Sequence, residues 1–162
     1  MTPQWRPMRH DDLPAVVDLA SRVHPDLPES EAVFAERLLL FPRGCLVLPC
    51  GDGIGGYAVS HPIRRFEPPA LNRLLAALPG DADDYYIHDV AVAPERRGGG
   101  HAAAAIGMIL DLARPYETAS LVSVYGTARY WSRFGFAPAD RDMGAKLAPY
   151  GPGAVYMLRR TR

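Results

Sequence analysis

The stretch VAVAPERRGGGHAAAAIGMIL, residues 90–110, decides the fold class. It contains a short apolar run, a turn at Pro94, three glycines and a segment with helical periodicity. One face of that helix would carry Ala102, Ala105, Ile106 and Ile109. Free N–H groups and the dipole at a helix start favour a phosphate, and glycines let it approach the backbone closely. Arg96 and Arg97 add positive charge, so we expect an anion-binding strand–loop–helix unit.

The alternative for this stretch is a plain strand-to-helix turn that binds nothing. Each of three consecutive glycines disfavours a helix interior by about 1 kcal/mol, so a simple turn does not account for them. The loop also lacks the Gly-Lys-Ser/Thr ending of a Walker A motif. An anion cradle is therefore the better interpretation.

A second glycine-rich stretch, GDGIGG at residues 51–56, spells G-x-G-x-x-G, the fingerprint of a dinucleotide site. That fingerprint requires a helix after the glycines, whereas residues 57–59 (YAV) predict a strand. The Asp-Gly pair inside it is a strong turn signal between two strands. We therefore predict a β-hairpin here, which disfavours a dinucleotide-dependent oxidoreductase.

Outward from these stretches, strand and helix patterns alternate along the chain. An early helix carries an apolar stripe of Leu13, Val16, Val17 and Ala20, and Ser30 can cap the next helix. The expected strands are 4–9, 45–49, 57–61, 85–92, 119–125, one from residue 136, and 153–159. The expected later helices are 68–79, with leucines in register, 99–113 and 127–134; residues 140–152 are loop. This order predicts a mixed α/β sheet with helices on its faces, in one domain over residues 1–162.

Composition excludes several classes of protein. The 18 basic and 18 acidic residues give a formal net charge of zero, which argues against a general nucleic-acid binder. No apolar run is long enough for a membrane span, and the first residues lack the apolar stretch of a signal peptide. Cys45 and Cys50 lie on opposite faces of one predicted strand and suggest no disulfide framework. We expect a reduced, cytoplasmic protein that binds neither nucleic acid nor membrane.

These motifs resemble the GNAT superfamily of N-acetyltransferases. RGGGHA at residues 97–102 matches the signature Arg/Gln-x-x-Gly-x-Gly/Ala, and VAVAP at 90–94 matches the strand end that precedes it. ARYWSRFGF at 128–136 matches the family's later helix and strand, and WRPMRHDDLPAVVDLA at the start resembles its first strand and helix. The resemblance implies a mixed, mostly antiparallel sheet flanked by helices and an acetyl-CoA-dependent N-acetyltransferase acting on a small-molecule or peptide amine.

The resemblance also implies where acetyl-CoA would bind. Its pyrophosphate would lie on the backbone N–H groups of residues 98–103, its pantetheine arm would pair with residues 90–92, and the helix near Thr127 would flank its thiol end. The implied cofactor-binding residues are Val90, Ala91, Val92, Arg97, Gly98, Gly99, Gly100, His101, Ala102, Ala103 and Trp131. No metal is implied, and a homodimer would fit the family.

The sequence departs from the family pattern at Trp131. The family often has a tyrosine there as general acid for the departing thiolate, but an indole N–H cannot yield a proton near pH 7. This loss favours the alternative hypothesis of a non-catalytic acyl-CoA sensor. A sensor binds acyl-CoA and releases no free thiol, whereas an enzyme does.

Three residues are candidates for the chemistry. An amine with an ordinary pKa near 10.4 must lose a proton before it attacks the thioester, so a nearby base helps. His88 and Asp89 lie on the strand before the glycines, where strand alternation should send them to opposite faces; packing roles are the alternative for both. Tyr125 ends the next strand, facing the predicted cofactor helix. Asp81, Asp83 and Asp84 would make an acidic end to the 62–84 connection, suited to a cationic amine or simply solvated.

Overall fold

The computed structural model describes residues 2–162, in which seven strands form one open sheet in the order β1-β2-β3-β4-β5-β7-β6. Every neighbouring pair is antiparallel except β4 and β5, which are parallel. This confirms the predicted mixed, mostly antiparallel sheet. The strands are β1 (Arg6–Pro7), β2 (Cys45–Cys50), β3 (Gly53–Ile63), β4 (Asp84–Val92), β5 (Thr118–Ser123), β6 (Ala137–Pro138) and β7 (Val155–Arg160).

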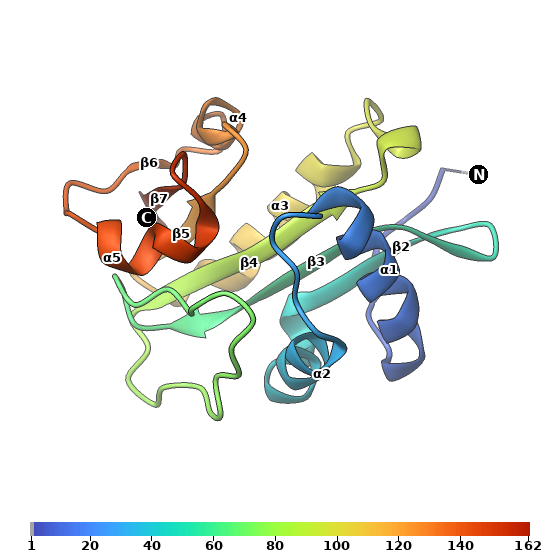
Figure 1. Ribbon diagram of the computed structural model, residues 1–162, viewed down its shortest axis with the longest axis horizontal. Helices are drawn as coiled ribbons and strands as arrows, with labels where there is room; N and C mark the ends of the chain where they lie inside the picture. The colour runs from blue at the N-terminus through green and yellow to red at the C-terminus, as the bar shows by residue number, and fades with distance from the viewer. Residues whose placement is uncertain (1) are drawn as a thin grey trace.

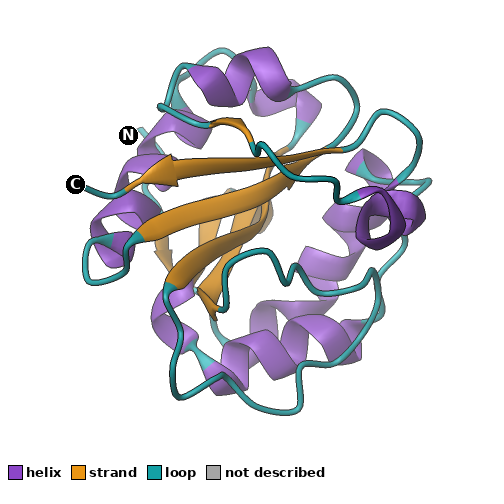
Figure 2. Cartoon of the chain, turned by 90° about the vertical axis from the view of Figure 1, so that its left-hand side faces the viewer, coloured by secondary structure: helices purple, strands orange, loops and turns teal. Residues whose placement is uncertain are grey.

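Helices cover both faces of this sheet (Figures 1 and 2). They are α1 (Leu13–Val23), α2 (Glu31–Leu40), α3 (His101–Ala113), α4 (Ala128–Ser132) and α5 (Gly144–Leu147). The first two pack on one face of the sheet and α3 on the other. Short α5 lies within the stretch predicted as loop, and Ser30 stands at the N-cap of α2 as predicted, although without a side-chain capping hydrogen bond. In the described part of the chain, no helix is long and apolar enough to cross a bilayer.

The apolar periodicity of the sequence selects the buried faces of α1 and α3. In α1, Leu13, Val16 and Ala20 are buried, whereas Val17 is half-buried at the edge of the stripe. In α3, the buried side chains are Ala105, Ile106, Ile109 and Ala113. Residues three and four apart share one face of a helix, so each helix buries one stripe and exposes the opposite one. Ala102, predicted on the α3 stripe, is only half-buried.

The GDGIGG stretch forms the turn of the β2–β3 hairpin and the first residues of β3, as predicted. Gly51 adopts a φ of 60°, which glycine reaches without steric cost. Cys50 pairs with Gly53 across the turn, and no helix follows the glycines. The helix-start geometry that a dinucleotide fingerprint requires is therefore not present at this hairpin. Cys45 and Cys50 are both free.

The predicted helix over residues 68–79 is wrong, because this segment is an irregular loop. Two carboxylates from the region of α2 accept its backbone N–H groups: Glu29 from Asn72 at 3.0 Å, and Glu36 from Leu75 at 2.5 Å and Ala76 at 3.0 Å. Asn72 and Ala76 also have positive φ, which a helix excludes. Tertiary hydrogen bonds thus override the helical spacing of the leucines.

The feature that shapes the centre of the molecule is the separation of β4 from β5. The two strands pair only between Asp84–Ile87 and Thr118–Leu121. Beyond this ladder the edge of β4 that faces β5 has no strand partner, although its other edge stays paired with β3 to Val92. A gap therefore opens between β4 and β5 in the middle of the sheet.

Gly44, just before β2, packs so closely against Ser60 of β3 that one added methyl group should lower the stability of the protein. A Cβ added to Gly44 would lie 1.9 Å from the backbone oxygen of Ser60, which cannot rotate away. We expect Gly44→Ala to destabilise the protein by about 1–3 kcal/mol or more, since overpacking must shift the backbone. Gly53→Ala is the matched control, because its Cβ would meet nothing within 4 Å. Urea unfolding midpoints measure both, and equal midpoints would contradict this packing.

Candidate active site

Two adjoining cavities lie where β4 parts from β5. The inner one has a volume of about 190 Å³ and the outer groove about 780 Å³. They share five lining residues: His24, Val90, Tyr125, Thr127 and Tyr130. The groove and the inner cavity therefore meet at one junction, framed by the end of α1, the middle of β4 and the β5–α4 loop.

The outer groove runs along β4 to the start of α3. Gly98 and Gly100 there have φ values of 89° and 76°, a conformation that glycine adopts freely. The first intrahelical hydrogen bond of α3 joins Ala104 N to Gly100 O at 3.1 Å, so the N–H groups before Ala104 have no helical acceptor. Arg96, Arg97 and Arg133 also line the groove. The strand–loop–helix unit that the sequence predicts is therefore present, and its binding of an anion stays a prediction.

The predicted cofactor residues fall mostly on this groove. It is lined by Val90, Ala91, Val92, Arg97, Gly98, Gly100, His101, Ala102 and Ala103. Gly99 is not among the lining residues and lies against the ring of His101. Trp131 lines the inner cavity instead, where its ring packs edge-on against Phe136 at a centroid distance of 5.9 Å.

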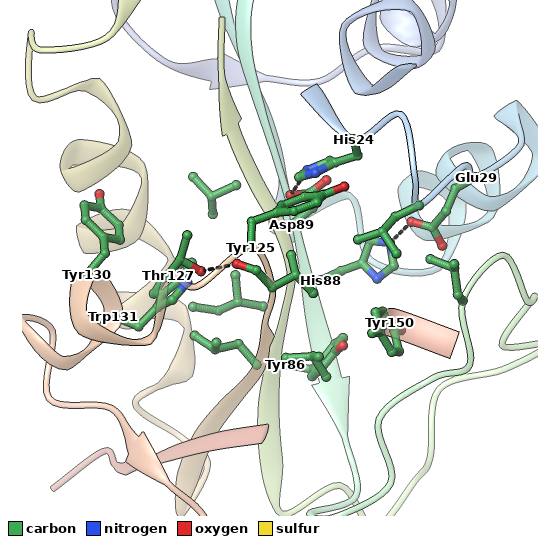
Figure 3. Close-up of a pocket in the computed structure, with 17 residues that line it drawn as sticks. His24, Glu29, Tyr86, His88, Asp89, Tyr125, Thr127, Tyr130, Trp131 and Tyr150 are labelled. Atoms are coloured by element: carbon green, nitrogen blue, oxygen red, sulfur yellow. Dashed lines mark hydrogen bonds and ion pairs between the residues drawn. The ribbon is translucent and has the colours of Figure 1, made fainter. Parts of the chain in front are cut away.

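His88 and Asp89 lie on the same face of the sheet, contrary to the predicted alternation. The register with β3 shifts between the pairs Val59↔Asp89 and Ser60↔Ile87, which leaves His88 as the extra residue of a β-bulge. A bulge breaks the two-residue period of a strand. Both side chains therefore face the α1–α2 side, and both line the inner cavity (Figure 3).

Asp89 holds a hydrogen-bonded chain at the junction. His24 Nε2 donates to its Oδ1 at 3.0 Å, and the Tyr57 hydroxyl donates to its Oδ2 at 2.5 Å. Burial raises the pKa of Asp89, but the hydrogen bond and charge of His24 outweigh it, so this pKa is lowered. Burial likewise lowers the pKa of His24, but the hydrogen bond and charge of Asp89 leave it raised. Asp89 is thus an ionised carboxylate that orients an imidazole.

His88 forms a second imidazole–carboxylate pair deeper in the cavity. Its Nε2 lies 2.6 Å from Oε1 of Glu29, and both side chains are almost fully buried. Burial would raise the pKa of Glu29, but the charge and hydrogen bond of His88 leave it lowered. Since the other oxygen of Glu29 accepts the Asn72 N–H, this carboxylate also connects the pair to the 64–83 loop.

Tyr125 covers the imidazole of His24. Its ring stacks on that imidazole with a centroid distance of 5.7 Å and an interplanar angle of 7°. Its φ of 56° turns the chain sharply just after β5, and its side chain lines both cavities. Burial, followed by the charge of Asp26, raises the pKa of Tyr125, so the phenol keeps its proton. The structure brings Tyr125 together with both predicted polar residues of β4.

The acidic end expected for the 62–84 connection does not reach the site. Asp81 pairs with Arg64 at 2.8 Å, and Asp83 accepts the backbone N–H of Arg65 at 2.8 Å. Asp84 is buried beneath the start of β5, where Thr118 donates to it at 2.8 Å. None of these carboxylates lines either cavity, because strong local partners engage each one.

Four polar side chains of the site escaped the sequence analysis: His24, Glu29, Tyr57 and Tyr150. His24 lies 65 residues from Asp89, and Glu29 lies 59 residues from His88. No motif or spacing marks such pairs. Among residues 2–162, no group of three or more His, Cys, Asp or Glu side chains is placed to hold a metal ion.

Known structures share this architecture along nearly the whole chain. The loading GNATL domain of CurA from Lyngbya majuscula superposes with a TM-score of 0.78 at 14% identity, covering 99% of this chain and 98% of that one. Arabidopsis thaliana Naa50, in complex with a bisubstrate analogue CoA-Ac-MVNAL, gives 0.71 at 15%, covering 98% and 97%. The ribosomal-protein-S18-alanine N-acetyltransferase from Escherichia coli gives 0.67 at 19%, covering 99% and 94%. At these identities the likeness shows the fold alone.

Sequence comparison identifies the family. No curated protein sequence matches the chain significantly. The family model described as Acetyltransferase (GNAT) family matches residues 5–136, which includes the first helix, the glycine-rich cradle and the helix that carries Trp131. The match covers most of the chain and every strand except β6 and β7. The chain therefore belongs to the GNAT acetyltransferase family.

Proposed function

We propose that this protein is an acetyl-CoA-dependent N-acetyltransferase that transfers the acetyl group to an amine by direct attack of the amine on the thioester. One observation carries the proposal. The anion cradle at the start of α3 leads along the unpaired edge of β4 to a junction at which His24, Asp89 and Tyr125 converge. A phosphate-bearing thioester and an amine would meet at that junction.

The outer groove fits CoA in shape and in hydrogen-bonding capacity. A Cβ added at Gly98 or Gly100 would meet nothing within 4 Å, so open space lies above this backbone. The free N–H groups and the dipole at the start of α3 suit a pyrophosphate. The open edge of β4 at Val90–Val92 offers backbone groups to the amide-bearing arm of CoA, in the way that a neighbouring strand would. The acetyl end would then lie near His24 and Tyr125.

We assign the role of proton acceptor to His24, because it lines both cavities. Because its Nε2–H donates to Asp89, the neutral ring carries its lone pair on Nδ1, which is buried and has no hydrogen-bond partner among the described residues. Asp89 then acts through His24: it fixes the ring and stabilises the imidazolium that forms. Both oxygens of Asp89 already accept hydrogen bonds, which makes it a positioning residue.

The departing thiolate needs less help than the amine. A thiol has an ordinary pKa near 8.5, so its anion is a tolerable leaving group. The start of α4 at Thr127, which would flank the thiol end, adds stabilisation. Tyr125 retains its proton and lines both cavities, so it is the available donor. Trp131 cannot supply a proton, and its position favours a role as cavity wall.

A non-catalytic acyl-CoA sensor is the competing function, and Trp131 is the observation that favours it. Two buried imidazole–carboxylate pairs argue against it, because a binding protein does not need oriented bases beside the thioester. We expect free CoA thiol to be released when the protein is given acetyl-CoA and a panel of amines from several classes. Calorimetric binding of CoA without thiol release from any amine would establish the sensor instead.

The cradle can be tested at one glycine. We expect Gly100→Glu to abolish CoA binding, because a carboxylate at the pyrophosphate position repels phosphate more than the helix dipole attracts it. Gly100→Asn controls for the positive φ without adding charge, and Gly107→Glu adds the same residue at an exposed position of α3. Calorimetry with CoA measures all three, with NAD as a cofactor that should not bind. Unchanged CoA affinity in folded Gly100→Glu would place the phosphate elsewhere.

The proton acceptor predicts a pH profile. The pKa of His24 is raised by Asp89, so kcat should rise with pH through a value above the ordinary 6.5, as the ring becomes neutral. We expect Asp89→Asn to lower kcat by about 10²–10⁴-fold and to move this limb to lower pH, since the charge that raises the pKa is lost. Trp131→Phe should change kcat less, at saturating acetyl-CoA.

The pH profile of kcat for His88→Gln shows which imidazole, His24 or His88, takes the proton. If His88→Gln loses activity while Asp89→Asn keeps the wild-type profile, the base is His88 and the proposed role of His24 is wrong. If neither substitution changes the rate, the amine loses its proton to bulk water, and the site works by positioning alone.

A further inference from the structure

The inner cavity offers no cationic side chain to a negatively charged substrate. In the part of the chain that the structure describes, its ionisable lining residues, tyrosines aside, are His24, Glu29, His88 and Asp89, with no arginine or lysine. Each imidazole is already held by one carboxylate. The four groups together carry no net positive charge even with both rings protonated, and a net charge of minus two with both rings neutral.

The neighbouring Arg37 and Lys146 do not line the cavity. The Arg37 side chain is fully buried, and its terminal nitrogens donate to Glu36 at 3.0 Å and to the backbone oxygen of Arg73 at 3.2 Å, while its Nε has no partner among the described residues. Lys146 Nζ donates to the backbone oxygen of Phe66 at 2.8 Å in an exposed position. Arg97 lines the outer groove, where the cofactor phosphates would lie. A carboxylate in the inner cavity would therefore be desolvated without a partner, which is strongly unfavourable.

The 64–83 loop and the segment between β6 and β7 are bonded to each other beside the cavity. Tyr150, from the loop between β6 and β7, donates its hydroxyl hydrogen bond to the backbone oxygen of Pro69 at 2.6 Å, and Lys146 makes the second bond between the same loops. Arg141 lies over the ring of Phe66, 3.7 Å from its centroid. With a volume of about 190 Å³, the cavity is smaller than the roughly 300–1,000 Å³ of a drug-sized site. This small volume favours a small acceptor over a polypeptide.

The remaining lining is largely apolar. It includes Leu27, Leu71, Val122, Val124 and Trp131. Tyr86 and Tyr150 lie side by side beneath His88, as Figure 3 shows. Such a surface suits an apolar or aromatic body, and the two carboxylates suit an ammonium group that arrives protonated.

We propose that the acceptor is a small primary amine on an apolar or aromatic body, with no carboxylate beside the amine; this rests on the proposed N-acetyl transfer. The amine nitrogen forms a bond to the acetyl carbon while the carbon–sulfur bond breaks. The ammonium first loses one proton to His24, and the second proton that the nitrogen loses during attack balances the proton that the departing thiolate takes up from Tyr125. Free amino acids are rejected because the cavity has no cation for their carboxylate.

Matched acceptors test directly whether a carboxylate beside the amine prevents acetylation. Phenylalanine, phenylalanine amide and 2-phenylethylamine share one body, as do leucine, leucine amide and 3-methylbutylamine. Thiol release gives kcat/KM for each, expressed per concentration of protonated amine, the form proposed to bind, because their pKa values differ. We expect the amide and the simple amine to exceed the amino acid by about tenfold or more. An amino acid that matches or exceeds its amide would overturn the proposal.

A substitution on the 64–83 loop should reverse the preference for the amide over the amino acid. Leu71→Arg adds a guanidinium to the cavity lining and should raise kcat/KM for the amino acid relative to its amide, whereas Leu71→Met should leave that ratio unchanged. No change in the Leu71→Arg ratio would contradict the charge argument. Faster acetylation of a pentapeptide than of the small amides would contradict the size argument. CoA binding without acetylation of any amine would instead refute the proposed N-acetyl transfer itself.

Discussion

The site depends on one interruption in strand pairing. The parallel ladder between β4 and β5 ends at Ile87 and Leu121, while β4 stays paired with β3 and β5 with β7. Backbone N–H and C=O groups on the open edge of β4 then need partners from outside the sheet. At the same point, the bulge at His88 brings two neighbouring polar residues to one face. A groove for an extended ligand and a polar cavity beside it thus arise from the same break.

Electrostatic pairing then determines what that cavity can do. A buried carboxylate is tolerated when it is paired and hydrogen-bonded, and Asp89 and Glu29 each have an imidazole partner and a second hydrogen-bond donor. The pairs fix the orientation of two rings that could otherwise rotate. Among residues 2–162, no arginine or lysine lines the cavity, while Arg96, Arg97 and Arg133 line the neighbouring groove. Under the proposed function, one junction would separate the region that binds the cofactor phosphates from the region that binds the amine.

Local signals in the sequence predict the parts of this structure that local physics governs. Helical periodicity and the glycine run define α3 and its cradle, and the Asp-Gly turn defines the β2–β3 hairpin. The prediction of a helix over 68–79 was wrong, because carboxylates from distant residues accept hydrogen bonds from the backbone N–H groups of this segment. The prediction that His88 and Asp89 lie on opposite faces was wrong, because a bulge has no clear sequence signal. The partners His24 and Glu29 could not be predicted, because only the folded chain brings them to β4.

The anchoring of the 64–83 loop has a consequence for how this site could evolve. Glu29 and Glu36 hold the loop through its backbone N–H groups, and Tyr150 and Lys146 hold it through backbone oxygens. Most residue types present those same groups, so the path of the loop depends little on the side chain of Leu71, although the Asn72 side chain also accepts the Ser30 N–H at 2.8 Å. Leu71 is therefore free to vary under selection while the fold and the paired imidazoles stay intact. New acceptors become accessible by mutational drift in a segment whose shape is inherited from its neighbours.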